Sequence, residues 1–244
     1  GSEWALMSVF ASATYVYDNR YMITGNFRAD ASSRFASNHA WGFFPSVSAG
    51  WKMSEEKFLK NISWLSDLKL RGSWGQLGNQ EIDNYTFMTL LKKDGDKYVI
   101  SRYGNPDLKW EKTKSINLGI NFSVLHSKVN GSFEYYYKKT EDLVTQREIP
   151  YENGEHSMYV NGGNMKNSGW ELSFSLVPVR TRDFVWSLGF NTSKVYNEVS
   201  SEFEPTGDWR EVVGGKYNKK GYPVSSFWAF RFAGLNPENG GPLF

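Results

Sequence analysis

Few side chains in this sequence have the types and spacing that catalysis or metal binding requires. The three histidines, His39, His126 and His156, are far apart and have no partners at ligand spacing, so they do not predict a metal site. Asp94-Gly95-Asp96 begins like a calcium-binding loop but lacks the later ligands and the closing glutamate, which indicates a surface turn. Cysteine is absent, which excludes a thiolate nucleophile. We therefore expect neither an enzyme nor a bound cofactor or metal.

Paired acidic residues occur at Glu55-Glu56 and Glu141-Asp142, where two carboxylates are the groups that a glycosidase uses. Each pair stands beside lysine or leucine in a predicted turn. Solvated turn residues are the preferred interpretation of both pairs.

Aromatic side chains in the predicted loops are the one group with a functional interpretation. Such rings stack on sugars or pack against partner proteins, because they combine a large apolar area with a polar handle on Tyr and Trp. The alternative is that the loops pack on one another through these rings. The candidate contacts to a substrate or to a lid protein are Trp41, Tyr85, Tyr98, Tyr103, Trp110, Tyr151 and Trp209.

The elements that position these loops are predicted to be amphipathic β-strands. Between Trp110 and Lys139 apolar and polar residues alternate, and His126-Ser127-Lys128 is the only interruption. Because successive side chains of a strand point to opposite faces, this pattern predicts an antiparallel hairpin. Further alternating stretches at 5–17, 21–32, 43–52, 68–74, 170–176, 184–191 and 227–234 raise the expected number of strands to about nine.

The same alternation assigns each predicted strand an apolar face and a polar face. The residues expected on the apolar, lipid-facing side include Ile120, Phe133, Leu172, Leu188 and Phe230. Those expected on the polar, interior side include Asn121, Glu134, Glu171, Asn191 and Arg231.

Composition narrows the fold class without deciding it. Aromatic residues make up 17% of the chain, but its mean hydropathy is only −0.53. An outer-membrane β-barrel has this combination because half of each strand faces a polar lumen. A lectin-like β-sandwich has it too. The formal net charge of +2, with no lysine or arginine stripe along the sequence, argues against a nucleic-acid partner.

Connection lengths favour the barrel over the sandwich. Short turns at 18–20, 126–128 and 180–182 alternate with long segments at 76–109, 141–167 and 197–224. Transmembrane β-barrels have short periplasmic turns and long extracellular loops, whereas Greek-key crossings in a sandwich mix the lengths. The pattern predicts an all-β, antiparallel transmembrane barrel segment with the three long segments on the outer surface.

Six ordered blocks of sequence resemble the SusC/RagA family of TonB-dependent outer-membrane transporters of Bacteroidetes. The blocks are YDNRYMITGNFRADASSRF (17–35), WGFFPSVSAGWKMSEEKFL (41–59), LKLRGSWGQLGN (68–79), GNPDLKWEKTKSINLGINF (104–122), NGGNMKNSGWELSFSL (161–176) and GYPVSSFWAFRFAGLNPENGGPLF (221–244). The resemblance covers essentially the whole chain.

The resemblance implies import of glycan or peptide oligomers, driven by the TonB complex, beneath a SusD-like surface lipoprotein that acts as a lid. It also implies a plugged barrel of about 22 strands, surrounded by outer-membrane lipid. Residues 1–244 would then form part of one barrel domain, with the plug, the TonB box and the N-terminal domain absent from this chain. The alternatives are a soluble β-sandwich domain that binds carbohydrate or acts as an adhesin, and a passive porin. The transported substrate is not decided by these residues.

Overall fold

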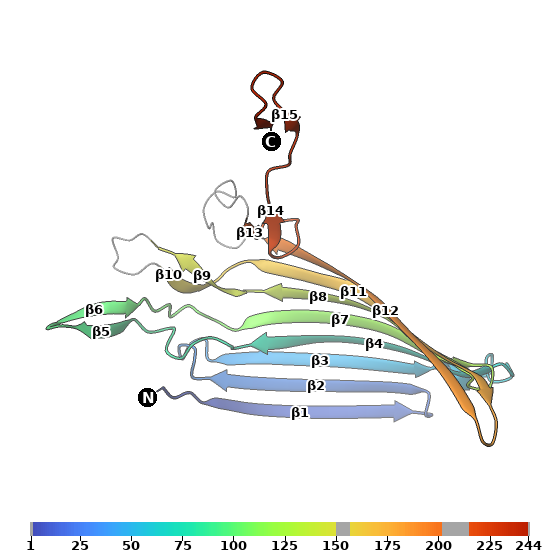
Figure 1. The fold of residues 1–244 in the computed structure, drawn as a ribbon. Helices are drawn as coiled ribbons and strands as arrows, with labels where there is room; N and C mark the ends of the chain where they lie inside the picture. The colour runs from blue at the N-terminus through green and yellow to red at the C-terminus, as the bar shows by residue number, and fades with distance from the viewer. Residues whose placement is uncertain (1, 150–156, 202–214, 244) are drawn as a thin grey trace.

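The computed structural model describes residues 2–149, 157–201 and 215–243, and its main element is one antiparallel sheet of eight strands (Figure 1). Neighbours in the sheet follow the order β1-β2-β3-β4-β7-β8-β11-β12, so every main strand pairs with the next main strand along the chain. The strands are β1 (Leu6–Tyr17), β2 (Tyr21–Ser32), β3 (Trp41–Lys52), β4 (Leu65–Asn79), β7 (Glu111–Val124), β8 (Val129–Glu141), β11 (Asn164–Arg180) and β12 (Val185–Ser201).

The shortest turns of this sheet lie at one end and its two longest connections lie at the other (Figure 1). We call these the turn end, formed by 18–20, 53–64, 125–128 and 181–184, and the loop end, formed by 33–40, 80–110 and 142–163. The turn end also holds the 3-10 turn η1 (Met53–Glu55). The predicted short turns therefore lie at the opposite end from the long segments 76–109 and 141–167. The alternation is not strict, because 53–64 at the turn end is longer than 33–40 at the loop end. The predicted long segment 197–224 begins within β12 and lies partly outside the described residues.

In the part of the chain that the structure describes, four two-stranded sheets accompany the main sheet. They are β5 (Leu90–Asp94) with β6 (Lys97–Arg102), β9 (Val144–Glu148) with β10 (Ser157–Asn161), β13 (Gly215–Tyr217) with β14 (Ser226–Trp228), and β15 (Gly234–Leu235) with β16 (Pro242–Leu243). The first two fold the long segments of the loop end, which the sequence pattern presented as plain loops.

Strand pairing confirms the predicted faces. Ile120 lies opposite Phe133, and Phe133 lies opposite Leu172, so these three share one face of the sheet. Leu176 and Leu188 are opposed on that same face. Glu134 and Glu171 are opposed on the other face, as are Asn121 with Ser132 and Ser173 with Asn191. We call these the apolar face and the polar face.

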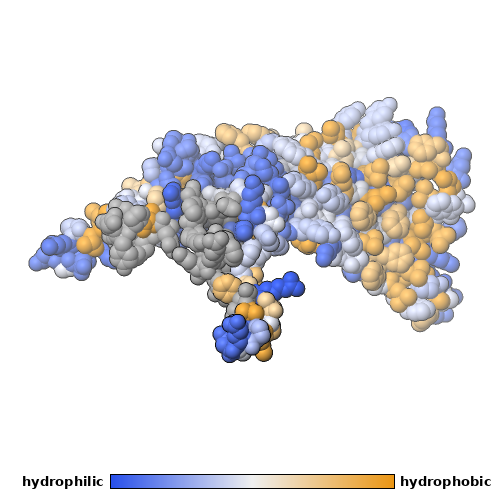
Figure 2. Space-filling view, turned by 90° about the horizontal axis from the view of Figure 1, so that it is seen from above, coloured by the Kyte–Doolittle hydropathy of each residue, from blue (hydrophilic) through white to orange (hydrophobic). Residues whose placement is uncertain are grey.

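The apolar face is richest in hydrophobic residues toward the turn end. Figure 2 shows them gathered there as a band, with hydrophilic residues at the extreme tip and toward the loop end. Tyr21, Phe133, Leu188 and Phe190 are among the large side chains that this sheet leaves exposed. The apolar series runs over 7–17 in β1 but over 186–190 in β12, and this shift is what strands tilted against a membrane would produce.

The prediction that 227–234 forms a ninth strand of the sheet is wrong. The stretch 227–234 is extended only at its two ends, in β14 and in β15, which begins at Gly234. These strands pair with β13 and β16 rather than with the main sheet. Phe230 and Arg231 lie outside any strand, so they carry no face assignment. Alternation is a local property, whereas a strand also requires a neighbour that satisfies its backbone hydrogen bonds.

Candidate functional site

Hydroxyl and amide side chains pair across neighbouring strands on the polar face. Ser12 Oγ donates a hydrogen bond to Asn26 Oδ1 at 2.7 Å, and the hydroxyl oxygens of Ser132 and Ser173 are also 2.7 Å apart. Cross-strand pairs of this kind stabilise a sheet and fix its register. The polar face is consequently an ordered surface of hydrogen-bonding groups.

An ion pair crosses the centre of the polar face. The Arg71 guanidinium donates from Nη2 to Oε2 of Glu134 at 2.5 Å, although these residues lie on strands that are not neighbours. Gly119 stands between them in the register, and a Cβ atom there would lie 2.7 Å from Arg71 Nε. Glycine at 119 therefore leaves the room that the arginine needs to reach across β7.

The ion pair borders a hollow of about 460 Å³ in the polar face. Side chains around it include Thr24, Ser48, Lys69, Arg71, Asn117 and Glu134. These groups can donate to and accept from a polar partner. Their types do not include a nucleophile paired with a general base. The arrangement suits binding or passage of polar groups.

At the loop end, a compact hydrophobic cluster replaces the open polar surface. Phe35, Phe44, Ile82, Leu108 and Trp110 are buried there together. The Trp110 ring lies 5.3 Å from the ring of Phe35 and 5.3 Å from that of Phe44, and its Nε1 donates to the carbonyl of Ala40 at 2.9 Å. Trp110 is only 3% exposed, so its ring packs the loops together, which is the alternative to ligand contact.

The other predicted aromatic contacts do not converge on one point. Trp41 is 45% exposed and lies on the apolar face, in register with Ala31. Tyr98 is 73% exposed on β6. Tyr85 is half-buried, and its hydroxyl accepts from the Glu3 amide at 3.2 Å. Tyr103 is also half-buried and forms a bridge with Met158. Tyr151 and Trp209 lie outside the described residues.

A polar hollow at the loop end has no counterpart in the sequence-based prediction. It measures about 470 Å³ and is lined by Arg34, Asn79, Glu81, Ile82, Asp83, Glu111, Val144 and Tyr159. The Tyr159 hydroxyl donates to Asp83 Oδ2 at 3.2 Å, and Arg34 Nε donates to Asn84 Oδ1 at 3.1 Å. Because five separate stretches of the sequence supply these residues, no local spacing could have revealed the hollow.

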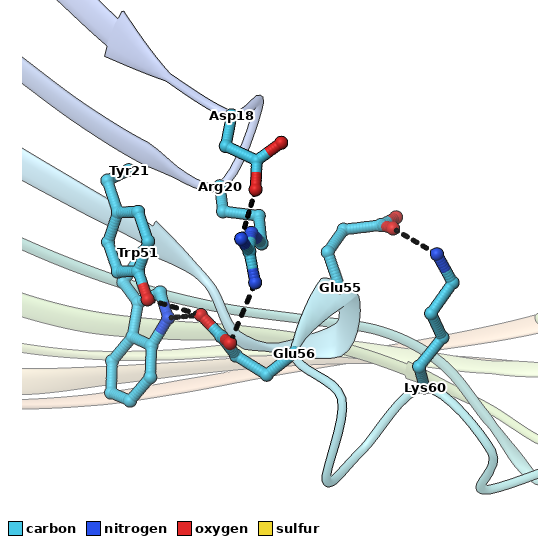
Figure 3. A network of polar contacts seen from close by, with 7 residues as sticks. All are labelled: Asp18, Arg20, Tyr21, Trp51, Glu55, Glu56 and Lys60. Carbon is cyan, nitrogen blue, oxygen red and sulfur yellow. Dashed lines mark hydrogen bonds and ion pairs between the residues drawn. The ribbon is translucent and has the colours of Figure 1, made fainter.

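A polar network at the turn end joins the first hairpin to the segment after β3 (Figure 3). The Tyr21 hydroxyl and Trp51 Nε1 both donate to Oε1 of Glu56, and Arg20 Nη1 donates to Oε2 at 2.9 Å. Arg20 also pairs with Asp18. The Glu56 side chain is only 12% exposed. The solvated-turn interpretation of this carboxylate is therefore wrong.

Glu56 links stability to pH. The hydrogen bond from Tyr21, then those from Trp51 and Arg20, hold the pKa of the Glu56 carboxyl below its ordinary value of 4.5. A lowered pKa stabilises the folded state above the ordinary value, and this contribution is lost as pH falls through the lowered value. Glu56→Gln is expected to lower the unfolding temperature of the full-length barrel in detergent at neutral pH. The difference from the unchanged protein should shrink as the pH falls below 4.5 and through the lowered pKa of Glu56.

The matched control is Glu55→Gln. Glu55 is 41% exposed and forms only the longer ion pairs to Lys52 and Lys60, at 3.2 Å and 3.9 Å, which contribute little in solvent. Equal effects of the two substitutions at neutral pH would contradict the role assigned to Glu56.

Within residues 2–149, 157–201 and 215–243, no group of three or more His, Cys, Asp or Glu side chains could hold a metal ion. In the same part of the chain, no helix has the length and apolarity needed to cross a membrane.

The fold and its two faces define a class of protein. An antiparallel meander with one apolar and one polar face, and with its longest loops at one end, is the wall of a transmembrane β-barrel. A β-sandwich would need a second large sheet packed on the first, and the described strands form none.

Comparisons with known proteins identify the family. The model of the TonB-dependent receptor-like β-barrel family matches residues 2–241, and the chain belongs to this family of outer-membrane proteins. The chain is 36% identical to the TonB-dependent receptor SusC of Bacteroides thetaiotaomicron, over 98% of the chain and 26% of SusC. It is 34% identical to the TonB-dependent receptor P39 of Formosa agariphila, over 95% of the chain and 22% of P39.

A solved structure agrees with the sequence comparisons. The RagAB peptide transporter superposes with a TM-score of 0.86 and 31% sequence identity, over 99% of this chain and 27% of the transporter chain. The chain therefore spans about a quarter of the length of these relatives. The resemblance to SusC/RagA transporters, the barrel fold, the outer-membrane location and the prediction that the chain is not an enzyme are all confirmed by this membership.

Proposed function

We propose that this chain forms part of the barrel wall of a TonB-dependent importer that takes up glycan or peptide oligomers. The polar face, with the Arg71–Glu134 pair and its hollow, carries the proposal, because it presents hydrogen-bonding groups opposite the lipid-facing band. One relative of the chain is named a TonB-dependent receptor, and another is named a peptide transporter. The plug, the TonB box and the N-terminal domain belong to other parts of a longer polypeptide, and a SusD-like lipoprotein covers the loop end.

The test is energy-dependent uptake by cells that carry the full-length protein. Fluorescent oligosaccharides and oligopeptides are supplied with and without a protonophore, and in a host that lacks TonB. We expect uptake of one of the two classes, lost under both treatments. Uptake that survives both treatments would establish the passive porin instead. Uptake of neither class would contradict the proposed substrates.

Within this proposal, one exposed and two half-buried tyrosine rings at the loop end are the candidate contacts to substrate or lid. Tyr98 is the most open of them, and Tyr85 and Tyr103 lie on neighbouring segments. Trp41, on the apolar face, is assigned to the membrane boundary rather than to the lumen. Tyr98→Ala is therefore included in the uptake assay, where a loss of uptake without a loss of surface protein would support the contact.

Sidedness is a separate expectation of the same proposal. The loop end should face the outside, so a cysteine at Asp94 should react with an impermeant maleimide on intact cells. A cysteine at Ser127, on the turn end, should not react. Both positions are exposed in the structure, so unequal labelling reports their side of the membrane. If only the cysteine at Ser127 reacted, the proposed sidedness would be the reverse of the true one. Asn153, in the predicted outer segment 141–167, lies outside the described residues.

A further inference from the structure

Three lysines form one cross-strand row on the apolar face, near the loop end. Lys114 lies opposite Lys139, and Lys139 lies opposite Lys166, in the register of β7, β8 and β11. Directly opposed residues share a face. Lys114 and Lys139 also continue the apolar-face series of their own strands. Lys114 stands two residues from Ile116, and Lys139 stands two residues from Tyr137. We call Lys114, Lys139 and Lys166 the lysine row.

The row places like charges against one another, which destabilises a sheet unless another charge compensates. Glu141 compensates in part, because it accepts from Lys114 Nζ at 2.7 Å and from Lys139 Nζ at 2.6 Å. Lys166 faces Glu198 in the register, but no ion pair joins them within the described residues. With Lys112 opposite Glu141, four lysines meet two glutamates, a local excess of two positive charges.

The position of the row relative to the membrane indicates what supplies the missing negative charge. The next row toward the turn end pairs Ile116 with Tyr137, and the one after it pairs Leu118 with Tyr135. Tyrosines with a polar hydroxyl mark the boundary between hydrocarbon and headgroups. The lysine row lies one row beyond them, about 7 Å further along the strands. Its ammonium groups therefore lie at the level of lipid headgroups.

We propose that the lysine row binds the phosphate groups of a membrane lipid whose acyl chains pack on the apolar face below it. The lipid is a phosphorylated glycolipid of the outer leaflet, and this leaflet assignment rests on the proposed sidedness. Phosphate oxygens accept charge-assisted hydrogen bonds from ammonium groups and cancel the repulsion within the row. An acidic protein partner is disfavoured because the row adjoins the lipid-facing band, whereas the long loops are at the open end.

The test compares two triple variants of the full-length protein, purified in mild detergent. One replaces Lys114, Lys139 and Lys166 with Gln. The control replaces Lys92, Lys93 and Lys97 with Gln. These lysines are exposed on the β5–β6 hairpin, so the control removes the same number of positive charges. Co-purified phosphorylated glycolipid is counted by native mass spectrometry. We expect a fall of about tenfold in the first variant and none in the control. Glu141→Gln should retain at least as much lipid as the unchanged protein.

Additions to the delipidated protein separate the sources of phosphate. The unfolding temperature should rise with the phosphorylated glycolipid and not with its dephosphorylated form. An equal rise with inorganic phosphate would overturn a lipid site, and a rise with anionic glycerophospholipid alone would overturn the glycolipid assignment. Unchanged retention in the row variant, or an equal fall in the control, would overturn the proposal altogether. If the triple variant does not assemble, judged by heat-modifiable migration, Lys166→Gln alone is measured.

Discussion

Arginine in place of Leu188 should destabilise the barrel by about 2–4 kcal/mol, because a charged group would then face the hydrocarbon of the bilayer. Leu188 lies on the apolar face, opposite Leu176 and between Trp186 and Phe190 in the apolar series of β12. The measurement is urea unfolding of the full-length protein in lipid vesicles, with the free energy obtained by linear extrapolation.

Asn191→Arg is the control, because it places the same charge three residues away on the polar face. Asn191 lies opposite Ser173, among mainly polar side chains that line a hollow. Its free energy of unfolding should change little. Similar losses at both positions would show that the two faces are assigned incorrectly.

Alanine in place of Trp110 should cost about 3–5 kcal/mol at the loop end, the usual range for removing a large buried ring. The substitution leaves a cavity between Phe35 and Phe44 and removes the hydrogen-bond donor to the Ala40 carbonyl. Because the cluster joins the loops to one another and to the loop-end part of β3, the loss should be local. Hydrogen exchange of segments 33–44, 80–89 and 105–111 should accelerate, while the turn halves of the strands keep their protection.

Trp74→Ala provides the comparison for this prediction. Trp74 is 40% exposed on the apolar face, where lipid can fill the space that the ring leaves. Its removal should change exchange at the loop end very little. If the two substitutions had the same effect, Trp110 would not be the centre of a distinct loop-end cluster.

Much of the sheet was predictable because its information is local. The alternation in β7, β8 and β11 directly assigns Ile120, Phe133 and Leu172 to one face, and pairing confirms it. The lengths of the strands were less predictable. Strand β11 runs over Asn164–Arg180, well beyond the alternating stretch 170–176. Polar residues at its loop-end part obscure the pattern, but hydrogen bonds to β8 and β12 keep the backbone extended.

The functional groups were predictable only in part. Loop aromatics can be recognised by type, but burial of Trp110 depends on Phe35 and Phe44, which are more than sixty residues away in sequence. Glu56 reads as a turn residue until the fold brings Arg20, Tyr21 and Trp51 to its carboxylate. Neither the hollow beside Tyr159 nor the Arg71–Glu134 pair has any local signature.

A meander of two-faced strands with its longest loops at one end follows from the order of the residues alone, because side-chain alternation and connection length are properties of neighbouring residues. Which residues meet across the strands follows only from how the strands pair. The lysine row shows the difference most clearly, since Lys114, Lys139 and Lys166 form no stripe along the chain. Pairing of β7, β8 and β11 sets them side by side, and a shift of one residue in either register would send part of the row to the opposite face.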